Sequence, residues 1–580
     1  MKYPTLRALK TSREMLDVFK GYHRGLRIAD GEFCDMENLS SDHYPLLSPR
    51  AARGVYATAG MAQGMVAKDA LCYIDGGDFI MEGTRVSMGL TAQDEPKTLV
   101  SMGAYVIIMP DKKYINTKDL SDHGNIEASV QTQGSVTFTL CKADGASYEN
   151  AAVSETAPSD PANLALWIDT SSVPHTLKQY SASSGTWAAI ATTYIKISAP
   201  GIGLPFSEQD GVTIAGVESE ALADLNAATV IWARGEDYIV VRGILDTVTT
   251  QTAPITVERR MPHMDFLIEC GNRLWGCRYG EARNGETVNE IYACRLGDFR
   301  NWNAFLGIST DSYAATVGTD GAFTGAIAHL GYPLFFKETC MHKIYGNYPA
   351  NYQIQTTTLR GVQSGCSRSL ATVGEVLYYK SRTGVLAYDG SLPTEISAAF
   401  GEVMYHNAVA GALGNKYYIS MADERGDHHL FAYDTQKNMW HREDGTQVTD
   451  FCSFQGDLFY IDYADNQIKS IKGAGVKEDR PVKWSATSGI IGTDSPDRKY
   501  VSRLDVRMKL EVSSRVTFFA EYDSGGEFEY LFTMTGKSLQ SFSVPVRPKR
   551  CDHFRLRIDG VGEAKIFSIC KTVEFGSNLT

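Results

Sequence analysis

Short apolar and aromatic runs, each opened by a small or acidic turn residue, recur along most of the chain. Four of the six intervals between their starts (34, 43, 40 and 42 residues) are close to the length of one four-stranded propeller blade. The repeat therefore predicts a β-propeller. Its seven copies are DALCYID (69–75), GAYVIIM (103–109), GNRLWGC (271–277), GYPLFFK (331–337), GEVLYYK (374–380), GNKYYIS (414–420) and GDLFYID (456–462).

Further strand-like segments flank these runs. A second apolar segment follows the best copies, as in TGVLAYDGS (383–391) and HHLFAYDTQ (428–436), and another precedes most of them, as in HNAVAGAL (406–413). Gly, Asn or Asp between such segments is the signal of a β-hairpin. Each unit is thus three or four antiparallel strands that cannot bury enough surface alone, so the units pack around an axis. We expect about seven blades.

One interval between copies is much longer than a blade. It measures 168 residues, which exceeds a blade by about 128 if a blade takes about 40. Residues 125–255 are rich in Ser, Thr, Ala and Gly and contain strand patterns, so they predict an inserted β-domain. The blades then occupy residues 51–124 and 256–477.

The two ends of the chain lack the repeat. Long alternating strands such as VSRLDVRMKLEV (501–512) follow residue 478, so residues 478–580 predict a C-terminal β-sandwich. Residues 1–50 predict an extended strap, with one short helix around LKTSREMLDVFKGY (9–22). The expected fold class is all-β: a roughly seven-bladed propeller with an inserted β-domain and a C-terminal sandwich.

Composition narrows the functional classes. The 580 residues are 43% hydrophobic and 21% charged, as in an ordinary globular protein of several domains. The net charge of −12 leaves no overall basic field to hold nucleic acid. Eleven cysteines without a CxxC pair indicate buried reduced thiols. The sequence shows neither a secretory signal nor an 18-residue apolar run, so we expect folding in a cytoplasm and no membrane partner.

The sequence lacks the common motifs of catalytic and metal-binding sites. The sequence contains no GxSxG elbow, no HExxH, no paired Cys and His spacing and no DxDxDG loop. We therefore expect no catalytic residue, no cofactor and no metal site, and a protein that is not an enzyme. Five aromatic residues fit packing between blades better than a sugar-binding platform. They are Trp275, Trp302, Trp440, Tyr378 and Tyr417.

A basic cluster near the C-terminus is the one candidate interaction site. It falls on a turn and the strand that follows, and it gives a positive edge to an acidic protein. A subunit contact to an acidic neighbour is the favoured interpretation, with a nucleic-acid site as the alternative. The cluster consists of Arg547, Lys549, Arg550, Arg555 and Arg557.

Two stretches carry a family resemblance. FKGYHRGLRIADGEFCDMENLSSDHYPLLSPRAARG (19–54) resembles the opening of virion tail proteins from phages and prophages of Gram-positive bacteria, and SFSVPVRPKRCDHFRLRIDGVGEAKIFSI (541–569) is similar to their end. The resemblance implies kinship with the nozzle class of short-tailed phages. In that class a propeller with an inserted domain forms a ring, expected to be six-fold, that closes the tail below the portal and adaptor.

Three functions follow from these observations. The leading hypothesis is a homo-oligomeric tail component in the virion, assembled in the host cytoplasm, that contacts adaptor, portal and fibre proteins. Genome DNA would pass through it without specific binding, because an acidic wall repels phosphate. The runner-up is recognition of a cell-wall glycan, with exposed aromatic residues in 183–194 as the first candidates. The third is a propeller glycosidase or lyase.

Overall fold

The computed structural model describes residues 10–92, 96–281, 285–477, 479–493, 498–536, 538–547 and 549–575. Over these residues the regular structure consists of β-strands and short 3-10 helices, which confirms the all-β prediction. No helix in these ranges is long and apolar enough to cross a membrane. The 3-10 helices are η1 (Ser41–His43), η2 (Glu220–Leu225), η3 (Pro349–Asn351), η4 (Ser367–Ser369) and η5 (Ala398–Phe400).

The chain divides into two compact units. Unit 1 consists of Met1–Lys97, Phe335–Met341 and Thr357–Thr580, and unit 2 of Thr98–Leu334 and His342–Thr356. Both units contain groups of four strands that form propeller blades, and the sheet β32–β35 has residues in both.

Four blades belong to unit 1, and one of them is completed from far away in the sequence. The strand β6 (Gly54–Thr58) pairs antiparallel with β46, so a segment near the N-terminus becomes the outer strand of the last blade. The other strands are β7 (Ala62–Ala67), β8 (Leu71–Asp75), β9 (Asp78–Met81) and β10 (Thr84–Ser87); β36 (Ala371–Val373), β37 (Val376–Lys380), β38 (Val385–Tyr388) and β39 (Thr394–Glu395); β40 (Tyr405–Leu413), β41 (Lys416–Asp423), β42 (His428–Asp434) and β43 (Met439–Asp444); and β44 (Val448–Phe454), β45 (Asp457–Asp462) and β46 (Gln467–Ser470).

The remaining blades follow the same order of strands. They are β11 (Thr98–Met102), β12 (Tyr105–Met109), β13 (Lys113–Asn116) and β14 (Asp119–Asn125); β28 (Phe266–Glu269), β29 (Leu274–Glu281), β30 (Thr287–Ala293) and β31 (Tyr313–Thr316); and β32 (Gly325–His329), β33 (Tyr332–Phe336), β34 (Cys340–Tyr345) and β35 (Gln353–Thr358). With the four blades above, the described residues form seven blades, which confirms the propeller prediction.

The repeated runs form the second strand of each blade, where they are buried. In β37 the residues Leu377 and Tyr379 are fully buried, and in β41 so is Tyr417. Aromatic rings from neighbouring blades meet, as in the contact between Tyr378 and Tyr417 with ring centroids 5.3 Å apart. Large aromatic side chains at a fixed strand position thus fill the space between blades, as predicted.

The inserted β-domain lies between β14 and β28 and consists of three sheets, two of which (β15-β27-β22-β23 and β24-β25-β21-β16-β26) share an apolar core. Its first and last strands pair with each other, with Ala128 opposite Arg259, so the chain enters and leaves at one place. Phe138, Ile197 and Val212 are among its fully buried side chains. The strands are β15 (Ala128–Gln131), β16 (Val136–Cys141), β17 (Ala152–Ser154), β18 (Leu166–Asp169), β19 (Thr176–Ser181), β20 (Thr186–Ala189), β21 (Tyr194–Ser198), β22 (Gly211–Ala215), β23 (Ala228–Val230), β24 (Ala233–Arg234), β25 (Tyr238–Arg242), β26 (Thr249–Gln251) and β27 (Thr256–Arg259).

Two sheets form the C-terminal sandwich. The first has the order β1-β53-β48-β51, and the second contains β47, β52, β49 and β50. From Arg503 onward burial alternates along β48: Arg503 is exposed, and Leu504 and Val506 are buried, so one side of the sheet faces the core. The strands are β1 (Lys10–Leu16), β47 (Lys483–Ser488), β48 (Lys499–Leu510), β49 (Arg515–Tyr522), β50 (Glu529–Thr535), β51 (Gln540–Val544), β52 (Phe554–Val561) and β53 (Ala564–Phe575).

The predicted N-terminal helix at 9–22 is wrong over the described residues. Residues 10–16 form β1, which pairs antiparallel with β53 along its whole length. The next strand, β2 (Gly21–Tyr22), is also extended. Residue 9 lies outside the described residues. Edge pairing to a strand some 550 residues away satisfies the backbone of this segment and overrides its local helical pattern.

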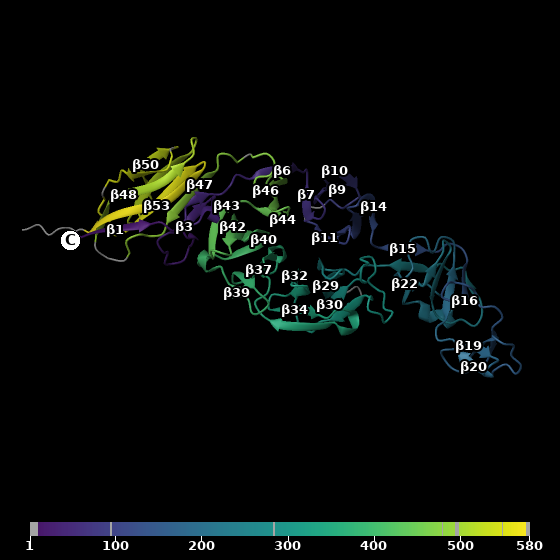
Figure 1. Cartoon of the computed structure of the whole chain (residues 1–580). Helices are drawn as coiled ribbons and strands as arrows, with labels where there is room; N and C mark the ends of the chain where they lie inside the picture. Colours follow the sequence, from purple (N-terminus) through teal and green to yellow (C-terminus); the bar gives the residue numbers. More distant parts are fainter. Residues whose placement is uncertain are drawn as a thin grey trace, which may run out of the picture. The chain divides into compact units, whose positions relative to one another are not determined.

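The strap joins the propeller to the sandwich within unit 1. A ten-stranded sheet has the order β40-β41-β42-β43-β2-β3-β47-β52-β49-β50, so one blade and one sandwich sheet are continuous. Strand β2 pairs with β43, and β3 (Glu32–Glu37) pairs with β47. Figure 1 shows β3, in purple, beside β43 and β47. Two short strands, β4 (Leu39–Ser40) and β5 (Ser48–Pro49), follow. We call the segment 19–54 the joint.

Candidate functional site

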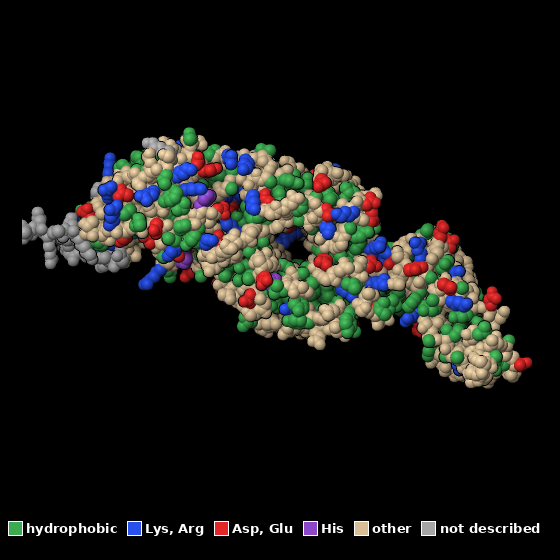
Figure 2. Space-filling view, in the orientation of Figure 1, with side chains coloured by type: hydrophobic (Ala, Val, Ile, Leu, Met, Phe, Trp, Pro, Cys, Tyr) green, Lys and Arg blue, Asp and Glu red, His purple; other side chains and the backbone are tan. Residues whose placement is uncertain are grey.

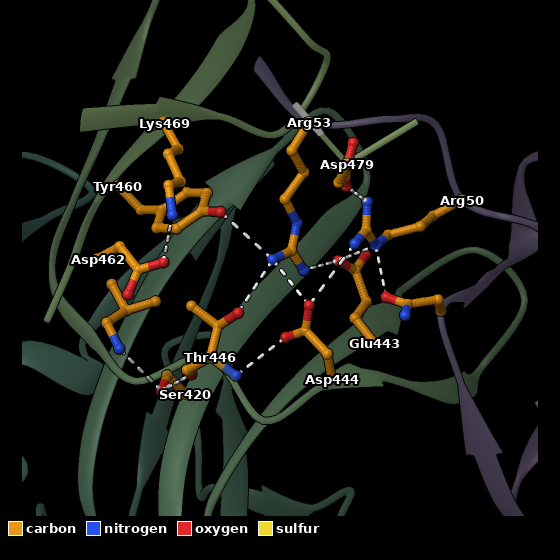
Figure 3. Close-up of polar contacts among 12 residues, drawn as sticks. Arg50, Arg53, Ser420, Glu443, Asp444, Thr446, Tyr460, Asp462, Lys469 and Asp479 are labelled. Carbon is orange, nitrogen blue, oxygen red and sulfur yellow. Dashed lines mark hydrogen bonds and ion pairs between the residues drawn. The ribbon is translucent and has the colours of Figure 1, made fainter. Parts of the chain in front are cut away.

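A buried ionic cluster anchors the end of the joint (Figure 3). Arg53 donates from Nη2 to Glu443 Oε2 at 2.6 Å, and its Nη1 lies 2.9 Å from Asp444 Oδ2. The same Nη1 also donates to the hydroxyls of Thr446 and Tyr460, at 3.1 and 3.3 Å. Arg53 thus connects the joint to β43 and β45 of two successive blades.

A second arginine extends the cluster toward the sandwich. Arg50 donates from Nη1 to Asp479 Oδ2 at 2.7 Å and from Nε to Asn38 Oδ1 at 2.7 Å. Its Nη2 lies 3.6 Å from Asp444 Oδ2. Because Asp479 lies between the last blade and β47, Arg50 ties both the strap and the start of the sandwich to the propeller.

The pKa shifts of Arg53 and Asp444 both favour their ionised forms. Burial alone would lower the pKa of Arg53, but Asp444, Tyr460 and Glu443 outweigh it and raise that pKa. Burial would raise the pKa of Asp444, and Arg53, Thr446 and Arg50 together lower it below its usual value. The side chains of Arg53 and Glu443 are only 7% and 3% exposed. The charges of the cluster are paired with one another. The cluster therefore acts as a clamp that holds the joint against the blades.

A neighbouring polar group lies under the strap. Lys416 donates from Nζ to Asp42 at 2.6 Å and to Ser40 at 2.9 Å. His441 in β43 is buried nearby, and burial, aided by Lys416, lowers its pKa to about 3. This histidine is neutral in the folded protein, so the strap covers a side chain that resists protonation.

A groove in unit 2 has a volume of about 770 Å³. Its charges are largely paired: Lys112 with Glu127 at 2.7 Å, and Arg260 with Glu258 at 2.6 Å. The hydrogen bond from Arg260 is the main cause of a lowered pKa at Glu258. A carboxyl held ionised in this way cannot donate a proton near neutral pH. The lining residues include Arg259, His263, Arg278, Glu281 and Tyr292.

One carboxyl of unit 1, that of Asp450, has a raised pKa instead of a lowered one. Asp450 in β44 accepts the backbone N–H of Met65 at 2.9 Å, and Arg368 lies 3.4 Å away. Burial raises the pKa of Asp450 in spite of Arg368, and its side chain keeps 19% exposure. A partly accessible carboxyl with a raised pKa is the kind of group that can act as a general acid.

The predicted basic cluster is spread over two places in the sandwich. Arg547, Lys549 and Arg550 are exposed in the segment before β52, where Lys549 pairs with Glu529. On β52, Arg555 lies 3.6 Å from Glu521, and Arg557 donates to Asp559 at 2.8 Å. Their role in a subunit contact stays a prediction.

The aromatic residues of 183–194 are already packed. Trp187 lies against Trp167 and Tyr180, with ring centroids 5.4 and 5.3 Å apart, and Tyr194 is buried. Glycan recognition there also stays a prediction. Within the described ranges, no group of three or more His, Cys, Asp and Glu side chains is arranged to hold a metal ion.

Sequence comparisons identify no family: no protein-family model and no curated protein matches the chain. Solved structures are similar in fold. An exo-β-1,3-galactanase from Phanerochaete chrysosporium is 8% identical over 53% of this chain and 94% of its own, with a TM-score of 0.21. PorZ, a surface component of the type-IX secretion system of Porphyromonas gingivalis, is 8% identical over 89% and 82%, with a TM-score of 0.24. A Trypanosoma rangeli sialidase is 9% identical over 91% and 96%, with a TM-score of 0.17.

These similarities correct one prediction. The expectation that the protein is not an enzyme is contradicted: several of the structures similar in fold are glycoside hydrolases. Absence of a catalytic motif was a weak basis for it, since the paired carboxylates of glycosidases need not be close in sequence. At such low identity the similarity concerns the fold alone.

Proposed function

We propose that the protein is a structural subunit of a bacteriophage tail, a nozzle-like ring component that closes the tail channel. The observation that carries the proposal is the joint. The segment 19–54, whose sequence resembles the opening of tail proteins, supplies β2, β3 and both arginines of the ionic cluster. The residues behind the resemblance are therefore those that couple the propeller to the sandwich.

Such a coupling suits a mechanical role. Continuous strand pairing from β40 to β50 transmits load through backbone hydrogen bonds, and bending at the joint would break several at once. The buried cluster adds charged partners that are costly to separate. A ring that must hold its shape while a genome passes through gains from subunits whose domains do not hinge.

The proposal includes partners and a location. The subunits form a homo-oligomeric ring, a hexamer if the resemblance holds, between adaptor or portal and fibre proteins, in a virion assembled in the host cytoplasm. A closed ring requires a heterologous contact whose rotation closes. The net charge of −12 favours passage of DNA without adhesion.

Electron microscopy and sedimentation of the purified full chain, alone and with tail partners, test the proposal. A ring of uniform copy number and detection of the chain in purified virions would support it. A persistent monomer that is absent from virions would refute it.

A glycoside hydrolase is the second candidate, and Asp450 is the observation that favours it. Glycosidases use one carboxyl as a general acid, and burial raises the pKa of Asp450 above its usual value. The test is a panel of bacterial polysaccharides with wild type, Asp450→Asn and the control Asp389→Asn, whose carboxyl has a lowered pKa. Hydrolysis lost only in Asp450→Asn supports this candidate, and an inactive wild type across the panel removes it.

A further inference from the structure

We propose that the outer face of the sandwich sheet β1-β53-β48-β51 carries an arginine-lined groove that binds the acidic inserted domain of a second copy of this chain. The inference rests on the ring proposed above and names the surfaces that would form its repeated contact.

The groove has a volume of about 520 Å³. The strand register brings its arginines together. Arg13 of β1 and Arg503 of β48 both lie opposite Thr572 of β53. Arg507 lies opposite Ser541 of β51. Alternation turns these side chains away from the sandwich core, so three arginines from two strands project on one side. The lining also contains Met15, Asp505, Ser543, Ser568 and Cys570.

Positive charge in this groove exceeds negative charge. Asp505 is the one carboxylate among the lining residues of the groove. It accepts from Arg503 Nε at 2.9 Å and from the Ser543 hydroxyl, and it lies 3.5 Å from Arg13 Nη2. Arg507 donates a hydrogen bond from Nε to the hydroxyl of Ser541 at 2.9 Å.

Two arginines of the groove still have hydrogen-bond donors with which they could bind a ligand. Within the described part of the chain, the Nη nitrogens of Arg503 and Arg507 have no hydrogen-bond partner. A guanidinium with free Nη groups presents a fork that matches a carboxylate, and a groove of this size accommodates several carboxylates at once.

The charge distribution along the chain favours another copy as the source of those carboxylates. Residues 125–255 hold 14 Asp and Glu against five Lys and Arg, whereas residues 478–580 hold 16 Lys and Arg against 14 Asp and Glu. Most of the net charge of −12 is thus in the inserted domain. Figure 2 shows Asp and Glu side chains on the exposed surface of that domain and many Lys and Arg side chains over the sandwich.

The helix η2 supplies a specific acidic surface on the inserted domain. Glu218, Glu220 and Asp224 are exposed around it, and within the described residues none of them forms an ion pair. Two different, complementary faces on one chain give a heterologous contact, which is the kind that a closed ring repeats.

Charge reversal tests the contact in the full chain. Sedimentation velocity compares wild type with R503E/R507E and with the control R382E/R425E, which makes the same charge change at exposed arginines of propeller turns. We expect R503E/R507E to need at least about tenfold more protein for half assembly, and the control to assemble as wild type does. Adding E220R/D224R to R503E/R507E should restore assembly. R503Q/R507Q serves as a milder variant if circular dichroism shows that R503E/R507E is unfolded.

Each of the other outcomes contradicts a specific part of the inference. If wild type forms rings and R503E/R507E forms them equally well, the groove is not the contact. If E220R/D224R fails to restore assembly, the η2 surface is not the occupant. Tight binding of polyphosphate with no effect of the variants on assembly identifies an anion site unrelated to the ring. A wild type that is always monomeric contradicts the ring itself.

Discussion

Arg53 donates a hydrogen bond of 2.6 Å to Glu443, although 390 positions separate the two residues in the chain. The contact connects the last residues of the joint to the end of β43, in a blade that is translated much later. The same N-terminal segment pairs through β2 and β6 with the blade strands β43 and β46, and through β3 with the sandwich strand β47.

Replacing Arg53 tests the clamp. We expect Arg53→Met to lower the free energy of unfolding by about 3–5 kcal/mol, because Glu443 and Asp444 would lose their closest cation and keep only Arg50, at 3.7 and 3.6 Å. Urea titration followed by tryptophan fluorescence measures the change. Arg85→Met is the control, because Arg85 is 54% exposed and pairs at the surface with Asp75 and Asp78, so little change is expected. Equal losses in the two variants would contradict the clamp.

Gly21 tests the pairing of β2 with β43. It has φ of +88°, and a Cβ there would lie 2.4 Å from the carbonyl oxygen of Trp440. Gly426 has nearly the same φ, +87°, with no atom within 4 Å. We expect Gly426→Ala to cost about 1–2 kcal/mol through backbone strain alone, and Gly21→Ala to cost clearly more. Thermal melting and limited proteolysis of the joint measure the difference, and similar stability of the two variants would show that the close approach is unimportant.

The buried His441 predicts a pH dependence. Its pKa falls from an ordinary 6.5 to about 3 in the folded protein, with burial as the main cause, Lys416 acting in the same direction, and Asp434 and Asp42 opposing. A depressed pKa means that its contribution to stability is complete above pH 6.5 and is lost progressively as the pH falls toward 3. We expect His441→Gln to flatten the stability profile across this window.

His123→Gln serves as the control, since His123 is exposed. Unfolding free energies at several values between pH 3 and 7 provide the profile. If wild type and His441→Gln lose stability in parallel as the pH falls, His441 is not the group responsible.

Thiol reactivity tests the burial of the cysteines. All eleven are free, and nine of them are buried, with Cys34 and Cys570 partly exposed. Burial raises the pKa of Cys72 and Cys452 to about 12, so few of these thiols ionise at pH 8. We expect a disulfide reagent to modify at most two thiols in the native protein and eleven after unfolding. Rapid modification of a C34S/C570S variant would disagree with the structure.

The repeated part of the fold was predictable because its signal is local. Strands such as β37 and β41 coincide with apolar runs that recur at a near-constant interval, so hairpin physics alone identifies the blades. The inserted domain and the sandwich followed from the places where the interval fails. Burial of Tyr378 against Tyr417 followed from their fixed place in the repeat.

The parts that depend on distant pairing were not predictable. The segment 10–16 has a helix-like pattern, and only its partner β53 makes it a strand. In the sequence the last repeat has three strand-like segments. Nothing in it indicates that β6 supplies the fourth strand. Arg50 and Arg53 stand in a phrase noted for its resemblance, but neither arginine was singled out, because their partners Glu443 and Asp479 come from the other end of the chain.

The arginine groove was missed for the same reason. Its side chains come from β1 and β48, and spacing within either strand gives no hint of the other. Clustering in sequence pointed instead to Arg547, Lys549, Arg550, Arg555 and Arg557, part of whose charge is paired with Glu529, Glu521 and Asp559.

Native mass spectrometry of the purified full-length chain, over a range of protein concentrations, tests the central claim most directly. The account predicts one closed oligomer of uniform copy number, six if the family resemblance holds, that dissociates as salt concentration rises. A chain that remains monomeric at every concentration, or that forms a continuous ladder of open oligomers, would contradict a ring-forming tail subunit.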